Sequence, residues 1–206
     1  HRSFNASNLK LELQQGKDGL LFQYGLELGL LSAHYSYASS LDVAAGEPFP
    51  DSPPSLTVRE ATLQPDGSQQ AAFVSGRWRM TDRLTTELGM RWDNQTWDRV
   101  DGGTQLSPRL NLRYDPDART QVRASWGRFY QAQGINELQL EDGIQTFFPA
   151  QRADHLILSA EHALVNHIRV RLEAYYKDYE ELRPRFENQF DPRVLIDIPP
   201  QVLAVA

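Results

Sequence analysis

The chain has 206 residues, no cysteine and a formal net charge of −6 at pH 7. The absence of cysteine excludes disulfides and cysteine-ligated metals, and an acidic chain whose basic residues are interleaved with acids argues against nucleic-acid binding. No run of about 18 apolar residues is present, so there is no membrane-spanning helix, and a membrane role would require a closed barrel.

Strands with two chemically different faces are predicted along most of the chain. In residues 83–93 the apolar and charged side chains fall on opposite parities. Because side chains alternate between the two faces of a strand, one face is apolar and the other is charged. The pattern predicts about eight strands, each of roughly 8 to 11 residues, a length close to that of membrane-spanning strands. In chain order, the alternation covers residues 9–13, 22–30, 74–80, 84–92, 106–114, 122–126, 156–160 and 168–176.

The predicted connections are alternately short and long. Short turns are expected at 16–19, 81–83, 115–119 and 163–166, and long loops at 41–68, 94–105 and 128–151. The proline-rich residues 46–55 cannot form a central strand. The best helix candidate, residues 134–140, is at most a short turn within a long loop. Outer-membrane barrels have this asymmetry, with short periplasmic turns and long extracellular loops.

The charged strand face has two interpretations. In a soluble antiparallel sandwich it would meet bulk water, and in a barrel it would line a wet lumen. Large aromatic residues near the predicted strand ends favour the barrel, because interfacial girdles place them there. The long-loop end has Trp92, Trp97, Trp126, Tyr35 and Tyr37, and the short-turn end has Trp78 and Tyr114.

In the barrel interpretation, one face of each strand contacts lipid and the other faces the water-filled lumen. The lipid-facing residues would be Leu84, Leu88, Met90, Trp92, Leu110, Leu112, Trp126, Val170 and Leu172. The lumen-facing residues would be Glu87, Arg91, Asp93, Arg109, Arg113, Arg123, Arg169, Arg171 and Glu173. Oppositely charged neighbours across strands would stabilise that inner wall.

The sequence contains no catalytic signature. Among five histidines, His162 and His167 flank a short turn and have no nearby carboxylate except Glu161, so we expect no metal site and no cofactor. Gly-rich phosphate loops, nucleophile elbows and zincin helices are absent, and we expect no enzyme. Ligand recognition is predicted in the extracellular loops, where cationic, aromatic and amide groups combine. The ligand-binding candidates are Arg128, Tyr130, Gln133, Asn136 and Tyr179.

Four segments carry a resemblance to a known family. The first is "LSPRLNLRYDPDARTQVRASWGRFYQAQGINELQ" (residues 106–139), and the others are "GRWRMTDRLTTELGMRWD" (76–93), "RADHLILSAEH" (152–162) and "RLEAYYKDYEELRPRFEN" (171–188). They resemble the barrel of TonB-dependent outer-membrane receptors. The resemblance implies a barrel of about 22 strands with an internal plug. It also implies residence among the lipids of the bacterial cell outer membrane and TonB-driven uptake of a scarce nutrient such as a siderophore, cobalamin or a saccharide.

Residues 1–206 are therefore expected to be a partial β-barrel domain, an all-β, antiparallel up-and-down transmembrane segment. No plug-like segment or TonB box precedes His1, and the closing "VLAVA" lacks the terminal aromatic residue of a complete outer-membrane barrel. The plug and remaining strands would lie outside this chain. Two alternatives remain open: a soluble extracellular β-sandwich binding module, and a small self-contained eight-stranded outer-membrane barrel.

Overall fold

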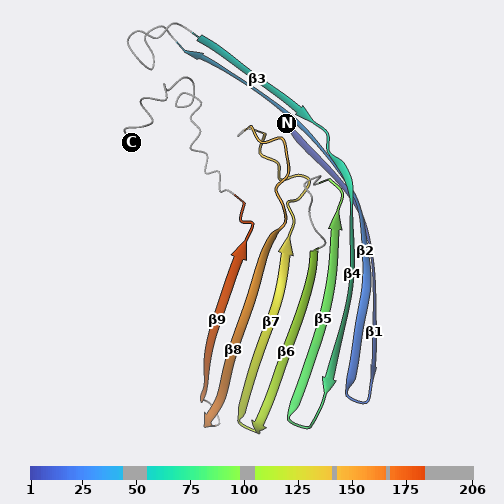
Figure 1. The fold of residues 1–206 in the computed structure, drawn as a ribbon, viewed down its shortest axis with the longest axis vertical. Helices are drawn as coiled ribbons and strands as arrows, with labels where there is room; N and C mark the ends of the chain where they lie inside the picture. The colour runs from blue at the N-terminus through green and yellow to red at the C-terminus, as the bar shows by residue number, and fades with distance from the viewer. Residues whose placement is uncertain (44–54, 98–104, 141–142, 166–167, 184–206) are drawn as a thin grey trace.

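Nine strands form one antiparallel sheet in the computed structural model, which describes residues 1–43, 55–97, 105–140, 143–165 and 168–183 (Figure 1). The sheet order is β1-β2-β4-β5-β6-β7-β8-β9, and β3 pairs with β2. This up-and-down order confirms the predicted fold class. The strands are β1 (Arg2–Lys17), β2 (Leu20–Val43), β3 (Ser55–Leu63), β4 (Asp66–Arg79), β5 (Leu84–Gln95), β6 (Gln105–Asp117), β7 (Thr120–Gln131), β8 (Gln151–Val165) and β9 (Ile168–Glu180).

The predicted long loop over residues 41–68 is wrong in part. Strand β2 continues to Val43, and β3 pairs with its distal half from Tyr35↔Leu63 to Val43↔Ser55. Strands β2 and β3 form a long arm that bends over the rest of the sheet (Figure 1). The proline cluster that suggested a loop falls largely within 44–54, outside the described residues.

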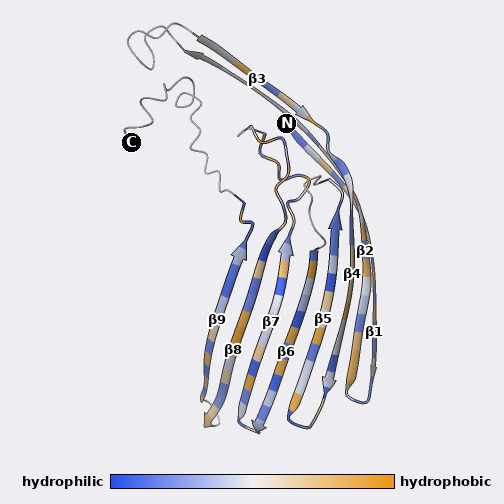
Figure 2. Cartoon of the chain, viewed as in Figure 1, coloured by the Kyte–Doolittle hydropathy of each residue, from blue (hydrophilic) through white to orange (hydrophobic). Residues whose placement is uncertain are grey.

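Hydrophobic and hydrophilic residues alternate along many of the strands (Figure 2), so the two faces of the sheet differ in polarity as the alternation predicts. We call them the apolar face, which carries Leu88, and the polar face, which carries Arg91. The strand register places all predicted lipid-facing residues on the apolar face and all predicted lumen-facing residues on the polar face. A one-residue slip of any strand would have exchanged the two sets.

The polar face is concave. Tyr35 lies on β2, yet its hydroxyl bonds to Ile135, which follows β7, and three strands of the sheet separate β2 from β7. A flat sheet would hold these groups apart, since neighbouring strands are spaced about 4.8 Å apart. The sheet therefore curves around its polar side, as the wall of a barrel does.

The strands are also staggered as barrel closure requires. The row of paired residues on the apolar face begins at Gln15, close to the turn that ends β1, and finishes at Tyr176, towards the opposite end of β9. Rows that climb across a sheet mean that its strands tilt relative to the barrel axis. The row consists of Gln15, Phe22, Gly76, Leu88, Leu110, Trp126, Leu156 and Tyr176.

Large hydrophobic side chains stand exposed over the whole apolar face. Leu172 is 74% exposed and Leu30 is 70% exposed, and apolar residues of every long strand accompany them. An exposed apolar surface larger than a few hundred Å² marks a site of protein or membrane contact. In the described part of the chain, no helix has the length and apolar character needed to cross a membrane.

Glycine is required at one point of the polar face, where Gly25 on β2 pairs with Phe73 on β4. A Cβ at Gly25 would lie 2.5 Å from the Leu11 carbonyl oxygen and 2.7 Å from the Phe73 ring. Gly25→Ala is therefore expected to lower the free energy of unfolding by about 1 to 3 kcal/mol, the usual cost of overpacking. Gly89→Ala is the matched control, because its Cβ would meet nothing closer than 3.4 Å. Equal unfolding midpoints for the two variants in detergent would contradict this expectation.

Candidate functional site

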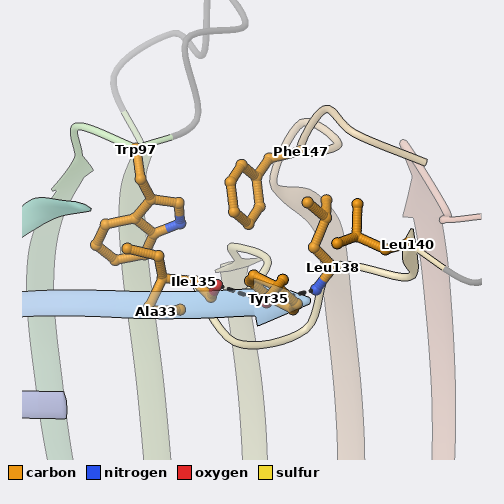
Figure 3. Close-up of a cluster of buried hydrophobic side chains, with 7 residues drawn as sticks. All are labelled: Ala33, Tyr35, Trp97, Ile135, Leu138, Leu140 and Phe147. Carbon is orange, nitrogen blue, oxygen red and sulfur yellow. Dashed lines mark hydrogen bonds between the residues drawn. The ribbon is translucent and has the colours of Figure 1, made fainter. Parts of the chain in front are cut away.

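The described residues between β7 and β8, 132–140 and 143–150, fold across the concave side and pack against the arm of β2 (Figure 3). We call them the crossing segment. Tyr35 is 1% exposed, and its hydroxyl donates to the Ile135 carbonyl at 2.7 Å and accepts from the Leu138 amide at 3.0 Å. These bonds fix the segment to β2. The buried cluster consists of Ala33, Tyr35, Trp97, Ile135, Leu138, Leu140 and Phe147.

Further hydrogen bonds order the crossing segment internally. The Trp97 indole N–H donates to the Gln133 carbonyl at 3.1 Å. The Gln133 side chain donates to the Glu137 carbonyl at 3.0 Å and accepts from the Phe148 amide at 2.8 Å. Because Gln133 is 4% exposed, these bonds satisfy a polar group that burial would otherwise penalise. The segment is thus held at both its start and its end.

Glu137 links the crossing segment to the residues that follow β9. Its carboxylate accepts a hydrogen bond from the Arg183 guanidinium at 2.9 Å and another from the Gly134 amide at 3.0 Å. The Arg183 bond, assisted by the Gly134 bond, holds the pKa of the Glu137 carboxyl below its ordinary value. A carboxyl with a depressed folded-state pKa stabilises the fold above its unfolded-state pKa, and this contribution is lost as the pH falls through the folded-state value.

Acidification below the ordinary pKa of a glutamate carboxyl is therefore expected to loosen the crossing segment. Tryptophan emission would report it, because Trp97 lies in the buried cluster. Glu137→Gln keeps the shape of the side chain but removes the titration, so its emission should change less over the same pH range. Identical acid transitions in the two proteins would show that Glu137 does not link pH to this segment.

Beneath the crossing segment lies a pocket on the polar face, with a volume of about 290 Å³. We call it the loop-end pocket, because β5 and β7 end there and the short turns lie at the other end of the sheet (Figure 1). Its wall comes from β4 to β7 and its roof from the crossing segment. It is lined by Gln69, Arg91, Asp93, Gln95, Trp97, Gln105, Ser107, Arg109, Phe129, Tyr130, Ala132, Gln133 and Gly134.

The charge of Arg91 is already balanced within the wall. Its guanidinium contacts Glu27 at 2.7 Å and Asp93 at 2.8 Å, and Lys10 contacts Glu27 at 3.2 Å. Lys10 and Arg91 also lie about 6 Å from the Phe73 ring centre, at 5.8 and 6.0 Å. This ion chain joins β1, β2 and β5 across β4, so its first role is to stiffen the wall.

Arg109 differs from Arg91. Its guanidinium lies 5.9 Å from the Phe129 ring centre, and no carboxylate forms an ion pair with it in the described part of the chain. Ser107, its neighbour on the same face of β6, is 5% exposed. The loop-end pocket therefore presents an uncompensated cation beside a hydroxyl and several amides, a combination suited to orienting a polar ligand.

The five predicted ligand-binding residues do not gather at one place. Tyr130 and Gln133 line the loop-end pocket, and Asn136 is exposed on the crossing segment. Tyr179 lies beside His155 on the polar face, with ring centres 6.1 Å apart. Arg128 forms an ion pair with Asp154 at 2.8 Å. It lies on the apolar face, because it has the same strand parity as Trp126. Their role in ligand binding stays a prediction.

Charged groups continue from Arg128 along the loop end of the apolar face. Arg152 lies 3.6 Å from Asp154 and also pairs with Glu180. We call these four residues the rim chain. Towards the short turns, the Thr120 hydroxyl and the His162 Nδ1 atom are 2.9 Å apart on the same face. Polar groups thus lie at both ends of the apolar band on β7 and β8.

The aromatic residues follow the predicted girdles only in part. Trp92 and Trp126 lie on the apolar face towards the loop end, and Trp78 and Tyr114 lie on it towards the turns. The placement of Tyr35 and Trp97 in a girdle was wrong, because both are buried in the cluster around the crossing segment. For Tyr35 a signal was available, since it shares the parity of Glu27, which belongs to the polar face.

A curved up-and-down sheet with an uncovered apolar face outside and a charged face inside defines a wall segment of a membrane β-barrel. The family model for the TonB dependent receptor-like β-barrel matches residues 2–182. The chain belongs to this family of outer-membrane receptors, which places it in the bacterial outer membrane.

One solved structure similar to the chain is the alcaligin outer-membrane receptor FauA from Bordetella pertussis, with 14% identity and a TM-score of 0.42. The match covers 88% of this chain and 38% of that one, so the chain spans well under half of the length of the receptor. No curated protein sequence matches the chain.

Proposed function

We propose that residues 1–206 form part of the barrel wall of an energy-coupled outer-membrane receptor that imports a scarce nutrient, such as a siderophore, cobalamin or a saccharide. The plug domain and the remaining strands belong to polypeptide outside these residues, and the TonB system acts through that plug. Lipid covers the apolar face, and the polar face lines the lumen.

The observation that carries this proposal is the loop-end pocket. Its position between the crossing segment and the concave wall is where a solute entering from the loop side would first meet the lumen. The pocket supplies directional contacts through its amide and hydroxyl groups and through Arg109, which forms no ion pair with a described residue. These are the properties of a capture site whose ligand must be released unchanged.

Both alternatives conflict with specific features of the sheet. A β-sandwich needs a second layer over its apolar face, yet large hydrophobic residues stand exposed there throughout the described strands. A self-contained eight-stranded barrel needs its first and last strands to pair. In the described residues β1 pairs only with β2 and β9 only with β8.

The test measures ligand binding to the whole receptor, purified in detergent. Ferric siderophores, cobalamin and oligosaccharides are titrated while tryptophan emission is followed, because Trp97 lines the pocket. Arg109→Gln is expected to weaken binding of the recognised compound by at least about tenfold, since a hydrogen bond to a charged group contributes about 1.5 to 3 kcal/mol. The control is Arg119→Gln, at the short turn between β6 and β7.

Two results would contradict the proposal. One is that no class of compound binds a folded receptor. The other is that Arg109→Gln and Arg119→Gln bind the same compound as tightly as the unaltered protein.

A further inference from the structure

Two hollows lie in succession on the apolar face, on the side of the sheet that points away from the lumen. One has a volume of about 530 Å³ and is lined by side chains of β1, β2, β4 and β5, among them Val74 and Trp92. The other, of about 560 Å³, occupies the next rows towards the loop end and includes Leu28 and Gln70. We call the two hollows together the outer groove.

The outer groove exists because β4 carries small side chains between strands that carry large ones. Ala72 on β4 lies directly between Leu26 on β2 and Trp92 on β5. The difference in side-chain size leaves the space above Ala72 unfilled. On the polar face at this level, the Phe73 ring fills the space beside Gly25. The hollow therefore opens towards the lipid side of the wall.

Neutral hydrogen-bonding groups lie at the loop end of the outer groove. Gln70 on β4 is directly opposite Asn94 on β5, and both residues are half-buried. Neither side chain forms a hydrogen bond with any residue in the described part of the chain. A half-buried amide without a partner costs free energy, so this end of the groove calls for a hydrogen-bonding group from outside the chain.

The direction of the outer groove matches that of a lipid tail in the outer leaflet. Gln70 lies near the start of β4, whereas Arg79 ends this strand at a short turn. The loop end of an outer-membrane barrel is its extracellular end. From Ser68 to Val74 the groove follows about 20 Å of strand, at roughly 3.4 Å per residue. A hydrocarbon chain lying there would have its polar end beside Gln70.

The lining of the outer groove also indicates the kind of headgroup. Phosphate groups are bound in proteins by arginine and lysine, and no charged residue is among the described residues that line either hollow. Side-chain amides and hydroxyls instead exchange hydrogen bonds with neutral groups, such as the hydroxyl and acylamide groups of sugars. The polar end of the groove therefore suits a sugar headgroup better than a phosphate.

We propose that the outer groove binds one acyl chain of an outer-leaflet glycolipid, with sugar or acylamide groups of its headgroup bonded to Gln70 and Asn94. The apolar lining of the groove is continuous with the rest of the apolar face, so the inference rests on the proposed placement of lipid against that face. It does not depend on which nutrient the receptor imports.

Native mass spectrometry of the whole receptor in detergent tests the site. Two lipids with equal acyl chains are titrated: an acylated glucosamine lipid without phosphate, and phosphatidylglycerol. Ala72→Phe fills the groove. Ala124→Phe is the matched control, because Ala124 is also half-buried on the apolar face but lies outside both hollows. We expect one glycolipid per receptor, bound at least tenfold more weakly by Ala72→Phe and within twofold of the original by Ala124→Phe.

The headgroup contact is tested separately. Gln70→Leu should weaken the glycolipid about fivefold, as the loss of one neutral hydrogen bond predicts, and should leave phosphatidylglycerol unchanged. Gln15→Leu is the control, since Gln15 lies on the apolar face near a short turn, outside both hollows. Thermal unfolding gives a second readout. The glycolipid should raise the unfolding temperature of the unaltered receptor more than that of Ala72→Phe, because a ligand of the folded state stabilises it.

Four results would overturn the proposal. The first is that no glycolipid is retained. The second is equal weakening by Ala72→Phe and Ala124→Phe, which would indicate a non-specific lipid shell only. The third is phosphatidylglycerol binding as tightly as the glycolipid. The fourth is a receptor dimer that Ala72→Phe abolishes, which would assign the groove to a second copy. Arg109→Gln should retain the glycolipid, so failures of the import proposal and of this one are distinguishable.

Discussion

Leu88→Arg is expected to lower the free energy of unfolding in detergent or lipid by about 2 to 4 kcal/mol, the cost of a cation near the middle of a barrel's lipid face. Leu88 lies on the apolar face in the middle of the row from Gln15 to Tyr176, and it is 48% exposed. In water, substitution of such an exposed residue would change the free energy of unfolding little. A large decrease therefore requires hydrocarbon around Leu88. Equilibrium unfolding by guanidinium in lipid vesicles measures the difference.

The matched control is Ser75→Arg on the polar face, directly opposite Gly89, which has no side chain to obstruct it. Its expected effect is below about 1 kcal/mol, because a lumen cation stays hydrated. Equal effects at the two positions would show that both faces meet the same solvent. A chain that folds as a cooperative monomer in plain buffer would count against the membrane barrel altogether.

Tyr35→Ala is expected to release the crossing segment from the arm of β2. Truncating a fully buried aromatic side chain costs about 3 to 5 kcal/mol. It also removes the hydroxyl that bonds both Ile135 and Leu138. Faster hydrogen exchange at residues 133–140 measures the release, with the strands of the sheet as the internal reference. Tyr35→Phe keeps the ring and should lower the stability of this contact by less, about 1 to 3 kcal/mol. The loss comes from the Ile135 carbonyl and the Leu138 amide, which are left without their hydrogen bonds to the hydroxyl.

Tyr37→Phe is the control for these variants. Tyr37 packs beside the cluster, but its hydroxyl forms no hydrogen bond with any residue in the described part of the chain. Its exchange pattern should match that of the unaltered protein. If the amides of the crossing segment exchange equally fast in Tyr35→Ala, Tyr35→Phe and Tyr37→Phe, Tyr35 does not anchor the segment.

Alternation alone was enough to predict most of the sheet and its two faces, because most strands contain a stretch in which one parity is apolar and the other polar. It failed for β3, which follows a proline-rich stretch that dominated the local pattern. It also failed for Tyr35 and Trp97, since proximity to a strand end does not say which face a side chain takes. Tertiary packing against the crossing segment decided their positions.

The loop-end pocket and the outer groove were less accessible to sequence reasoning. Arg91, Asp93 and Arg109 were predicted on the lumen side, but their meeting with Gln133 depends on how far the sheet curves and where the crossing segment lands. Likewise, the outer groove depends on the register of β2, β4 and β5. Both arrangements depend on contacts between residues far apart in the sequence, whereas the charge of each residue can be taken directly from the sequence.

The rim chain and the pair Thr120–His162 set limits to how thick a bilayer this wall can accept. Along β8, Asp154 and His162 are separated by about 27 Å of strand at roughly 3.4 Å per residue. A tilt of about 40° reduces this to about 21 Å along the membrane normal, slightly less than the usual apolar band of about 25 Å. Thicker membranes would have to compress around the protein or bury the rim carboxylates. Hydrophobic mismatch would therefore favour its retention in a thin bilayer such as the outer membrane.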